Sequence, residues 1–443
     1  MRQAVFRNRA DIDAGWQPNM LMMFNLAYIG ILCVAQIRGG TMLLSIVLFA
    51  FLALTAVAAS WHKSLPFLLF FLPWSPLLKL YQGSVSFYTI AVLLACMIHF
   101  VRSGWKLEPY ELFCVAFIAI FTLLAKVVQG NSLSMSYIFF FAMLVLLPSL
   151  IGRDAHNGSF LELTIFFAVG IISAALIAQR IAAYPHVSQF VKVDSYLTIT
   201  RLSGFYGDPN FYSAHITACF AGIQVLLIEK TRPAVRFPLM ILAALLVYCG
   251  LLSASKSFVV VFAAQFFVWV IILLGERNRG SASFRVLIGV AVAAVIMFSS
   301  SAVQDLLRII DTRFSYAANV SQITTGRTDL WKMYIHELLN DPVLLMLGEG
   351  YTAVTINGRA SHNTILQGVY QFGLLCIPVV VFWMVQTLKA VRRGQGILSV
   401  NHLMFLLLFV GVVLPWLGLD ILFFDEFFLL PVYMMRGAEK TED

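Results

Sequence analysis

Charged side chains are scarce in this sequence. Asp, Glu, Lys and Arg make up 12% of its 443 residues, about half of the roughly 25% found in soluble domains. The deficit falls in repeated apolar runs of about 17–25 residues, each able to cross a hydrocarbon core of about 30 Å as a helix. Because the runs are continuous rather than alternating, they favour helices over a barrel. The sequence therefore predicts an all-α polytopic membrane protein.

Patterns typical of disulfides and metal sites are also missing. All six cysteines lie inside apolar runs without CxxC spacing, so we expect them to be small packing residues. The loops expected on the outer side contain no DxD pair, and Asp11 and Asp13 are expected in the cytoplasm. We therefore expect neither a metal nor another cofactor. The net charge of +8 does not indicate a nucleic-acid partner, because membrane proteins concentrate Lys and Arg in cytoplasmic loops.

The apolar runs predict about fourteen spans. The first is retained, because its run is too long for a signal-peptide core. A count of twelve stays open, because one run contains three prolines and the last two are separated only by a sharp turn near Asp420. The spans are placed near residues 19–37, 41–60, 64–80, 84–101, 110–128, 135–151, 160–183, 209–229, 237–253, 257–275, 285–303, 362–388, 401–418 and 419–435.

The placement of Lys and Arg predicts that both ends of the chain are cytoplasmic, because with this orientation nearly every short inside loop is basic. The resulting organisation has six parts. They are a cytoplasmic N-terminus (1–18), N-terminal transmembrane helices (19–183), a transmembrane core (184–303) whose first outer loop covers 184–210, a large outer loop (304–361), C-terminal transmembrane helices (362–435) and a cytoplasmic tail (436–443).

Cations on the outer side run against this charge bias. Most of them lie in two outer segments, and Lys256 lies at a third outer turn. Long loops escape the charge rule, which is one explanation. The other is that particular cations bind an anion, and arginine suits phosphate because its planar group donates paired hydrogen bonds. Candidates for a diphosphate site are Arg201, Lys256, Arg327 and Arg359.

The first outer loop ends in a turn cluster, TRLSGFYGDPNFYSAH, at residues 200–215. Pro209 suits the first turn of the next helix, with Asp208 as its N-cap. A helix N-terminus attracts anions, and Arg201 lies just upstream. A simple capping motif is the alternative interpretation. Asp208 and Asn210 are supporting candidates.

The large outer loop contains an amphipathic segment, residues 324–342, in which apolar residues recur at helical spacing. Thr325 or Thr328 is expected to start this helix, and Asn340-Asp341-Pro342 to stop it. We expect it to lie on or near the outer bilayer surface. Arg327 stands at its beginning, and the alternative is a surface helix whose charge is incidental.

The stretch SHNTILQGVYQFG begins the next apolar run at Ser361. Ser361 is expected to cap the helix that His362 and Asn363 begin. The helix dipole would disfavour a charged imidazole there, so His362 should tend to be neutral and could act as a general base. An interfacial or capping role is the alternative. His186 and His215 are reserve candidates for the base.

Residues 200–375 contain an ordered set of short motifs: R-x-S-G-x-x-x-D-P-N, S-K, G-R-T-D-L-W, G-E-G-Y and H-N. This set resembles the O-antigen ligase and polymerase superfamily. The resemblance implies a GT-C-type helical bundle. It also implies a glycosyltransferase that takes a glycan from undecaprenyl diphosphate at the outer face of the bacterial inner membrane. Arg201 and Arg327 match arginines thought to hold the diphosphate. Lys256 stands where many members have arginine, and His362 matches the proposed catalytic base, with Asn363 beside it.

The expected function is polymerisation of a surface polysaccharide. An acceptor hydroxyl attacks the anomeric carbon, the carrier diphosphate leaves, and the configuration inverts. The catalytic candidates are His362 and Arg327. Expected partners are the undecaprenyl-diphosphate-linked oligosaccharide, a glycan acceptor and membrane lipids, with a chain-length regulator protein as a further candidate.

Two alternatives stay open. A ligase would transfer the glycan to lipid A core, and nothing in the sequence separates it from a polymerase. A polysaccharide flippase belongs to another class, and the scarcity of ionisable residues near the middle of the spans counts against it.

Overall fold

The structure is a computed structural model of the whole chain. It describes residues 2–103, 108–151, 158–191, 194–196, 199–228, 233–275, 304, 308, 311, 326–351, 355–390 and 402–438. The predicted span 285–303 lies outside these residues. The chain forms two compact units, one made of residues 1–105 and 146–208 and the other of residues 106–145 and 209–443.

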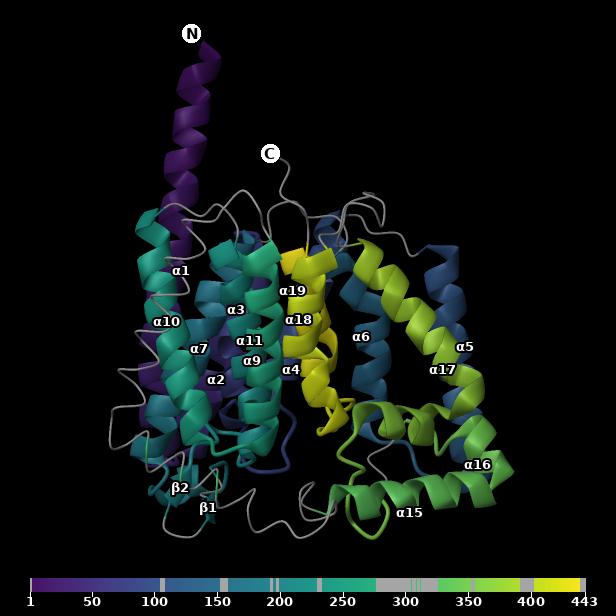
Figure 1. Cartoon of the computed structure of the whole chain (residues 1–443). Helices are drawn as coiled ribbons and strands as arrows, with labels where there is room; N and C mark the ends of the chain where they lie inside the picture. Colours follow the sequence, from purple (N-terminus) through teal and green to yellow (C-terminus); the bar gives the residue numbers. More distant parts are fainter. Residues whose placement is uncertain are drawn as a thin grey trace. The chain divides into compact units, whose positions relative to one another are not determined.

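Within the described residues, eight helices are long and apolar enough to cross a membrane. The described part of the chain is therefore mainly α-helical, as expected of a multi-pass membrane protein. Figure 1 labels the helices, which are α1 (Arg2–Arg38, apolar from Asn19), α2 (Thr41–Ser60), α5 (Pro109–Gln129), α7 (Phe160–Ile181), α9 (Pro209–Ile228), α10 (Pro233–Leu252), α11 (Lys256–Gly275) and α17 (Thr364–Ala390). All match predicted spans.

Shorter apolar helices account for four more predicted spans. They are α3 with the 3-10 helix η1 (Ser64–Phe71 and Leu72–Leu77), α4 (Phe87–Ser103), α6 (Met135–Ile151), and α18 with the 3-10 helix η3 (His402–Val412 and Leu414–Leu417). The proline-rich run predicted as a span at 64–80 is broken, because Pro73 and Pro76 lie in the 3-10 segment.

The first unit packs α3 closely on α7. At Gly170 a Cβ atom would collide with the main chain of Phe70, so only glycine allows this approach. An ion pair between Lys63 and Glu162, 2.7 Å long, joins the start of α3 to the start of α7. Beyond α7, the unit has a short helix α8 (Pro185–Ser188) and an antiparallel hairpin of β1 (Asp194–Tyr196) and β2 (Ile199–Arg201).

The second unit is built around α9, which is almost wholly buried and contacts α10, α11, α18 and α19 (Glu426–Ala438). Side-chain hydrogen bonds bridge these helices. Gln265 Nε2 donates to the Thr217 carbonyl at 2.7 Å, and Thr217 Oγ1 donates to the Gly411 carbonyl at 3.0 Å. Polar side chains in a low-dielectric core are tolerated when they find such partners.

The last span differs from the prediction. Sequence reasoning placed it at 419–435, but the helix α19 begins at Glu426 and residues 418–425 form a loop. The apolar residues of this segment pack as loop side chains. Tyr351 and Phe423, for example, have ring centroids 5.0 Å apart.

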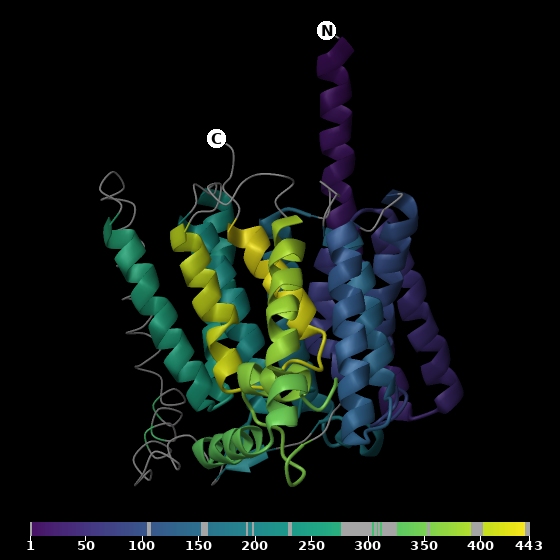
Figure 2. The ribbon, with the colours of Figure 1, turned by 90° about the vertical axis from the view of Figure 1, so that its right-hand side faces the viewer.

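Two further helices complete this unit, and the first of them was predicted from the sequence. The amphipathic segment forms α15 (Arg327–Asn340), followed at once by α16 (Pro342–Leu347), which Asp341 caps by accepting hydrogen bonds from two main-chain amides. Neither threonine starts α15. Its N-cap is Gly326, with φ of 79° and no side-chain hydrogen bond, so that part of the prediction is wrong. Figure 2 shows α15 beside the ends of the longer helices of its unit.

The helix α17 is kinked at Gly373, where φ is 64° and ψ is 166°. Gly348, with φ of 73° and ψ of −176° after α16, meets this kink backbone to backbone. A Cβ atom at Gly348 would lie 2.6 Å from the Gln371 carbonyl oxygen, and one at Gly373 would collide with the Met346 carbonyl. Only glycine commonly adopts these dihedral angles. The pair therefore fixes where the N-terminal part of α17, residues 364–372, turns into its longer remainder.

We predict that Gly373→Ala lowers stability by at least about 1–3 kcal/mol, because alanine is strained at these angles and its Cβ has no space. Gly368→Ala, in the same helix, is the matched control. Its nearest neighbour would be 3.6 Å away, and alanine favours a helix. Thermal unfolding of purified protein in detergent measures both. Equal midpoints for the two variants would contradict the packing described.

A buried lysine joins the Gly348 turn to α5. Lys126, 2% exposed, donates from Nζ to the Ser132 carbonyl at 2.9 Å and lies over the Tyr137 ring. Glu349 accepts hydrogen bonds from Asn131 and from the Tyr370 hydroxyl. Gly350 packs directly on the Lys126 side chain. The cation and the carboxylate thus stabilise the same junction.

We predict that Lys126→Met and Glu349→Gln each destabilise the protein, because each leaves a partly buried charge of one sign uncompensated. The double variant should lose less than the sum, with a coupling of about 0.5–3 kcal/mol. A thermal-unfolding cycle of the four proteins measures this coupling. Simple additivity would mean that the two charges act independently.

Candidate functional site

The loop at residues 418–425 is the meeting point of several chain segments in the second unit. Thr364, the first residue of α17, donates from Oγ1 to the Leu419 carbonyl at 2.7 Å and accepts from the Ile421 amide at 3.2 Å. Tyr351 donates its hydroxyl proton to the Leu422 carbonyl at 3.3 Å. These bonds hold the loop against the start of α17 and the turn after α16.

Arg327 reaches this loop from the start of α15. Its Nη1 atom would lie 2.7 Å from a Cβ atom built on Gly418, so glycine leaves the space that the guanidinium group occupies. The Arg327 side chain is half-buried. A guanidinium group suits a polyanion, because its planar fork donates paired, charge-assisted hydrogen bonds.

The helix α15, called the arm here because it carries Arg327 at its start, is held in place by aromatic side chains. Trp331 donates from Nε1 to the Ser361 carbonyl at 2.9 Å. The Tyr334 hydroxyl donates to the Arg359 carbonyl at 2.8 Å and accepts from the Ile356 amide at 3.3 Å. On its other face the Tyr334 ring packs edge-on against Tyr370 of α17. Burial accordingly raises the pKa of Tyr334.

His362 lies between Ser361, which is bonded to Trp331, and Asn363. Its main chain has a φ of 50°, an uncommon conformation for a residue with a side chain. Ser361 does not cap α17. Asn363 does, because its Oδ1 accepts from the amides of Ile365 and Leu366, both at 3.0 Å. His362 therefore precedes the helix rather than beginning it.

His362 lies just outside the cap, so the helix dipole acts on it less directly than predicted. A neutral imidazole at pH 7 stays a prediction. The position still suits a base, because the bonds of Ser361 and Asn363 fix the main chain on both sides and leave the side chain half-buried.

Asn210 and Lys256 approach the same loop through their neighbours. The helix α9 begins at Pro209, as predicted. Asn210 Oδ1 accepts from the Ser255 hydroxyl at 2.7 Å, immediately before Lys256 at the start of α11. Phe211 packs against Phe424, with ring centroids 5.1 Å apart. Four of the predicted site residues thus belong to segments that contact the loop or a direct neighbour of it. They are Asn210, Lys256, Arg327 and His362.

The acids of this region were missed as site residues. Asp420 is 5% exposed, and burial raises its pKa to about 7. Glu426 begins α19, and its Oε1 lies 3.1 Å from Nε2 of the buried His215, a reserve candidate. In the sequence, Asp420 marks only the turn between the last two predicted spans, and Glu426 falls within the last of them. The available signal was that these acids interrupt an otherwise apolar segment.

Arg359 does not share this arrangement. Its carbonyl accepts from Tyr334, but its side chain is exposed. Arg201 and Asp208 belong to the first unit. Arg201 ends β2 and is 8% exposed.

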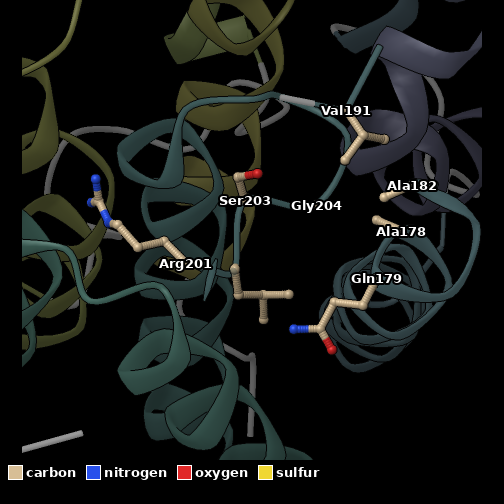
Figure 3. Close-up of a pocket in the computed structure, with 8 residues that line it drawn as sticks. Ala178, Gln179, Ala182, Val191, Arg201, Ser203 and Gly204 are labelled. Atoms are coloured by element: carbon tan, nitrogen blue, oxygen red, sulfur yellow. The ribbon is translucent and has the colours of Figure 1, made fainter. Parts of the chain in front are cut away.

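A pocket of about 270 Å³ lies beside Arg201, between the end of α7 and the chain that leaves β2. Ala178, Ala182 and Val191 provide apolar walls, and Gln179 and Ser203 add polar groups. Figure 3 shows the Arg201 guanidinium group directed away from Gln179 and the two alanines. The pocket therefore does not place that cation at its centre.

No protein-family model matches this chain, and no curated protein matches it by sequence.

We predict that the raised pKa of Asp420 makes stability depend on pH. The folded state holds this proton up to about pH 7, whereas an unfolded Asp releases it near pH 4. The free energy of unfolding should therefore fall as pH rises from about 4 to 7, by up to a few kcal/mol, and then level off. Asp420→Asn should flatten this slope.

Thermal unfolding across that pH range measures the effect. Asp329→Asn is the matched control, because the Asp329 side chain is 61% exposed and its removal should leave the slope as in the unaltered protein. An unchanged slope in Asp420→Asn would contradict the assignment.

Proposed function

We propose that this protein is a glycosyltransferase of the GT-C type. It takes a glycan from a polyprenyl diphosphate at the outer face of the bacterial inner membrane, with both chain ends in the cytoplasm. The observation that carries this proposal is that Arg327 and the main chain around His362 are fixed around one loop, residues 418–425. A cation and an imidazole in one neighbourhood suit a reaction in which a hydroxyl loses a proton and a diphosphate gains charge.

The proposed reaction is a single displacement. The acceptor oxygen forms a bond to the anomeric carbon, and the bond from that carbon to the diphosphate oxygen breaks. The hydroxyl proton passes to His362, and the electron pair of the broken bond stays on the leaving diphosphate. Arg327, with Lys256, would stabilise that growing charge. The anomeric configuration inverts because attack and departure occur on opposite sides.

Positioning accounts for the rest of the proposed catalysis. The bonds of Trp331 and Tyr334 to the chain at 359–361 keep the arm and the His362 segment at a fixed spacing. A fixed spacing lowers the entropic cost of bringing two large substrates together. The acceptor proposed is another carrier-linked repeat unit, which makes the protein a polymerase. Transfer to lipid A core, by a ligase, is the second candidate.

We predict that His362→Ala lowers glycan transfer by about 10²–10⁴-fold, the usual contribution of a general base. Arg327→Ala should lower it by about 10²–10³-fold, and Arg327→Lys should retain part of the activity, because it keeps the charge but loses the planar fork. The controls are His336→Ala and Lys332→Ala, which change exposed residues of α15. The assay is reconstitution with purified carrier-linked oligosaccharide.

The same assay distinguishes a polymerase, a ligase and a transporter. A ladder of products without lipid A core means a polymerase, and activity only after core is added means a ligase. Export without transfer in any mixture would mean a transporter and would overturn the proposal. Full activity in His362→Ala, with normal folding, would remove the histidine from the chemistry. Arg201→Ala and Asp208→Ala test those two predicted residues separately.

A further inference from the structure

The helices α15 and α16 expose an apolar strip that the candidate site does not use. Its members are four exposed apolar side chains: Ile335 46%, Leu339 69%, Val343 45% and Met346 42%. Ile335 and Leu339 are four residues apart and therefore share one side of α15. Asp341, in an extended conformation, separates the two helices, and each helix contributes two exposed residues to the strip.

The strip is separate from the two other faces of α15. Leu330, Tyr334 and Leu338 form a core with Tyr370 of α17. The polar face contains Asp329 and Lys332, which approach to 3.6 Å, and His336, which contacts Asn340. A helix with a core face needs only one apolar side in water. A second apolar side, flanked by charged residues, is typical of helices that lie in a membrane interface.

The strip continues onto membrane-spanning helices. The helix α16 packs against both α5 and α17. At this end α5 exposes Val127, at 77%, and α17 exposes Leu374, at 45%, directly after the kink at Gly373 that touches the Met346 main chain. Figure 1 shows α15 lying across the ends of α5 and α17 rather than along them. The strip therefore lies where these spans end.

We propose that this strip is a lipid-docking surface, with Ile335, Leu339, Val343 and Met346 inserted among the lipids at the boundary between headgroups and acyl chains. Lipid is favoured over a second protein because Val127 and Leu374 belong to spans whose exposed side chains face the bilayer. A protein covering the strip would have to displace lipid from both helices.

The docked strip would set the height of the candidate site above the membrane. The arm that carries it also carries Arg327, and Trp331 of the same arm bonds to the carbonyl of Ser361, the residue before His362. Anchoring the arm in the interface would therefore hold Arg327 and the His362 segment at the level where a lipid headgroup lies. The docking surface does not depend on the reaction proposed above, and its test needs no activity.

A spin label at each of two neighbouring positions tests the proposal. Leu339→Cys and Asn340→Cys are labelled in the full chain, in vesicles of phosphatidylethanolamine and phosphatidylglycerol, and collisions with oxygen and with a water-soluble nickel complex are measured. The six native cysteines are buried, which favours labelling at the new site. We expect the oxygen-to-nickel ratio to be several-fold higher at 339 than at 340.

The pattern should repeat at Ile335→Cys against His336→Cys. Equal access of the nickel complex at 339 and 340 would mean that the strip faces water and would overturn the proposal. Low access to both reagents at 339 would mean contact with protein, including a second copy, and would overturn it as well. Far-ultraviolet circular dichroism of each labelled protein confirms that the helices are intact.

Discussion

The hydroxyl of Thr364 is the contact on which the candidate site depends. It donates to one main-chain group of the 418–425 loop and accepts from another, so a single side chain fixes a stretch of loop against the start of α17. Without this contact the loop would have to satisfy its carbonyls elsewhere in an apolar setting, which is costly. The space at Gly418 that receives Arg327 exists only while the loop is held there.

The same rule of satisfying buried polar groups explains much of the second unit. Gln265 and Thr217 use main-chain carbonyls of neighbouring helices, and Glu426 faces His215 across the start of α19. Lys126 finds a carbonyl and an aromatic face at the end of α5. Each group would be expensive alone in a low-dielectric core, so each also specifies which helices are neighbours.

The membrane-spanning character and most helix positions could be predicted from the sequence, because long apolar runs are a local signal. The start of α9 at Pro209 and the periodicity of α15 were equally local. The kink at Gly373 was not, because it lies in an unbroken apolar run and is specified by Gly348, 25 positions earlier. The loop at 418–425 was taken for a span because its side chains are apolar. The contact of Arg327 with Gly418 and the burial of Asp420 depend on tertiary packing. No local sequence pattern indicates either of them.

The frame around residues 355–361 is held by main-chain groups. Trp331 and Tyr334 bond to the carbonyls of Ser361 and Arg359 and to the amide of Ile356, while the side chains of Asn357 and Arg359 stay exposed. Substitutions of the Arg359 side chain therefore leave these hydrogen bonds in place. A scaffold of this kind allows descendants of one ancestral gene to diverge in what they recognise while the geometry beneath stays unchanged.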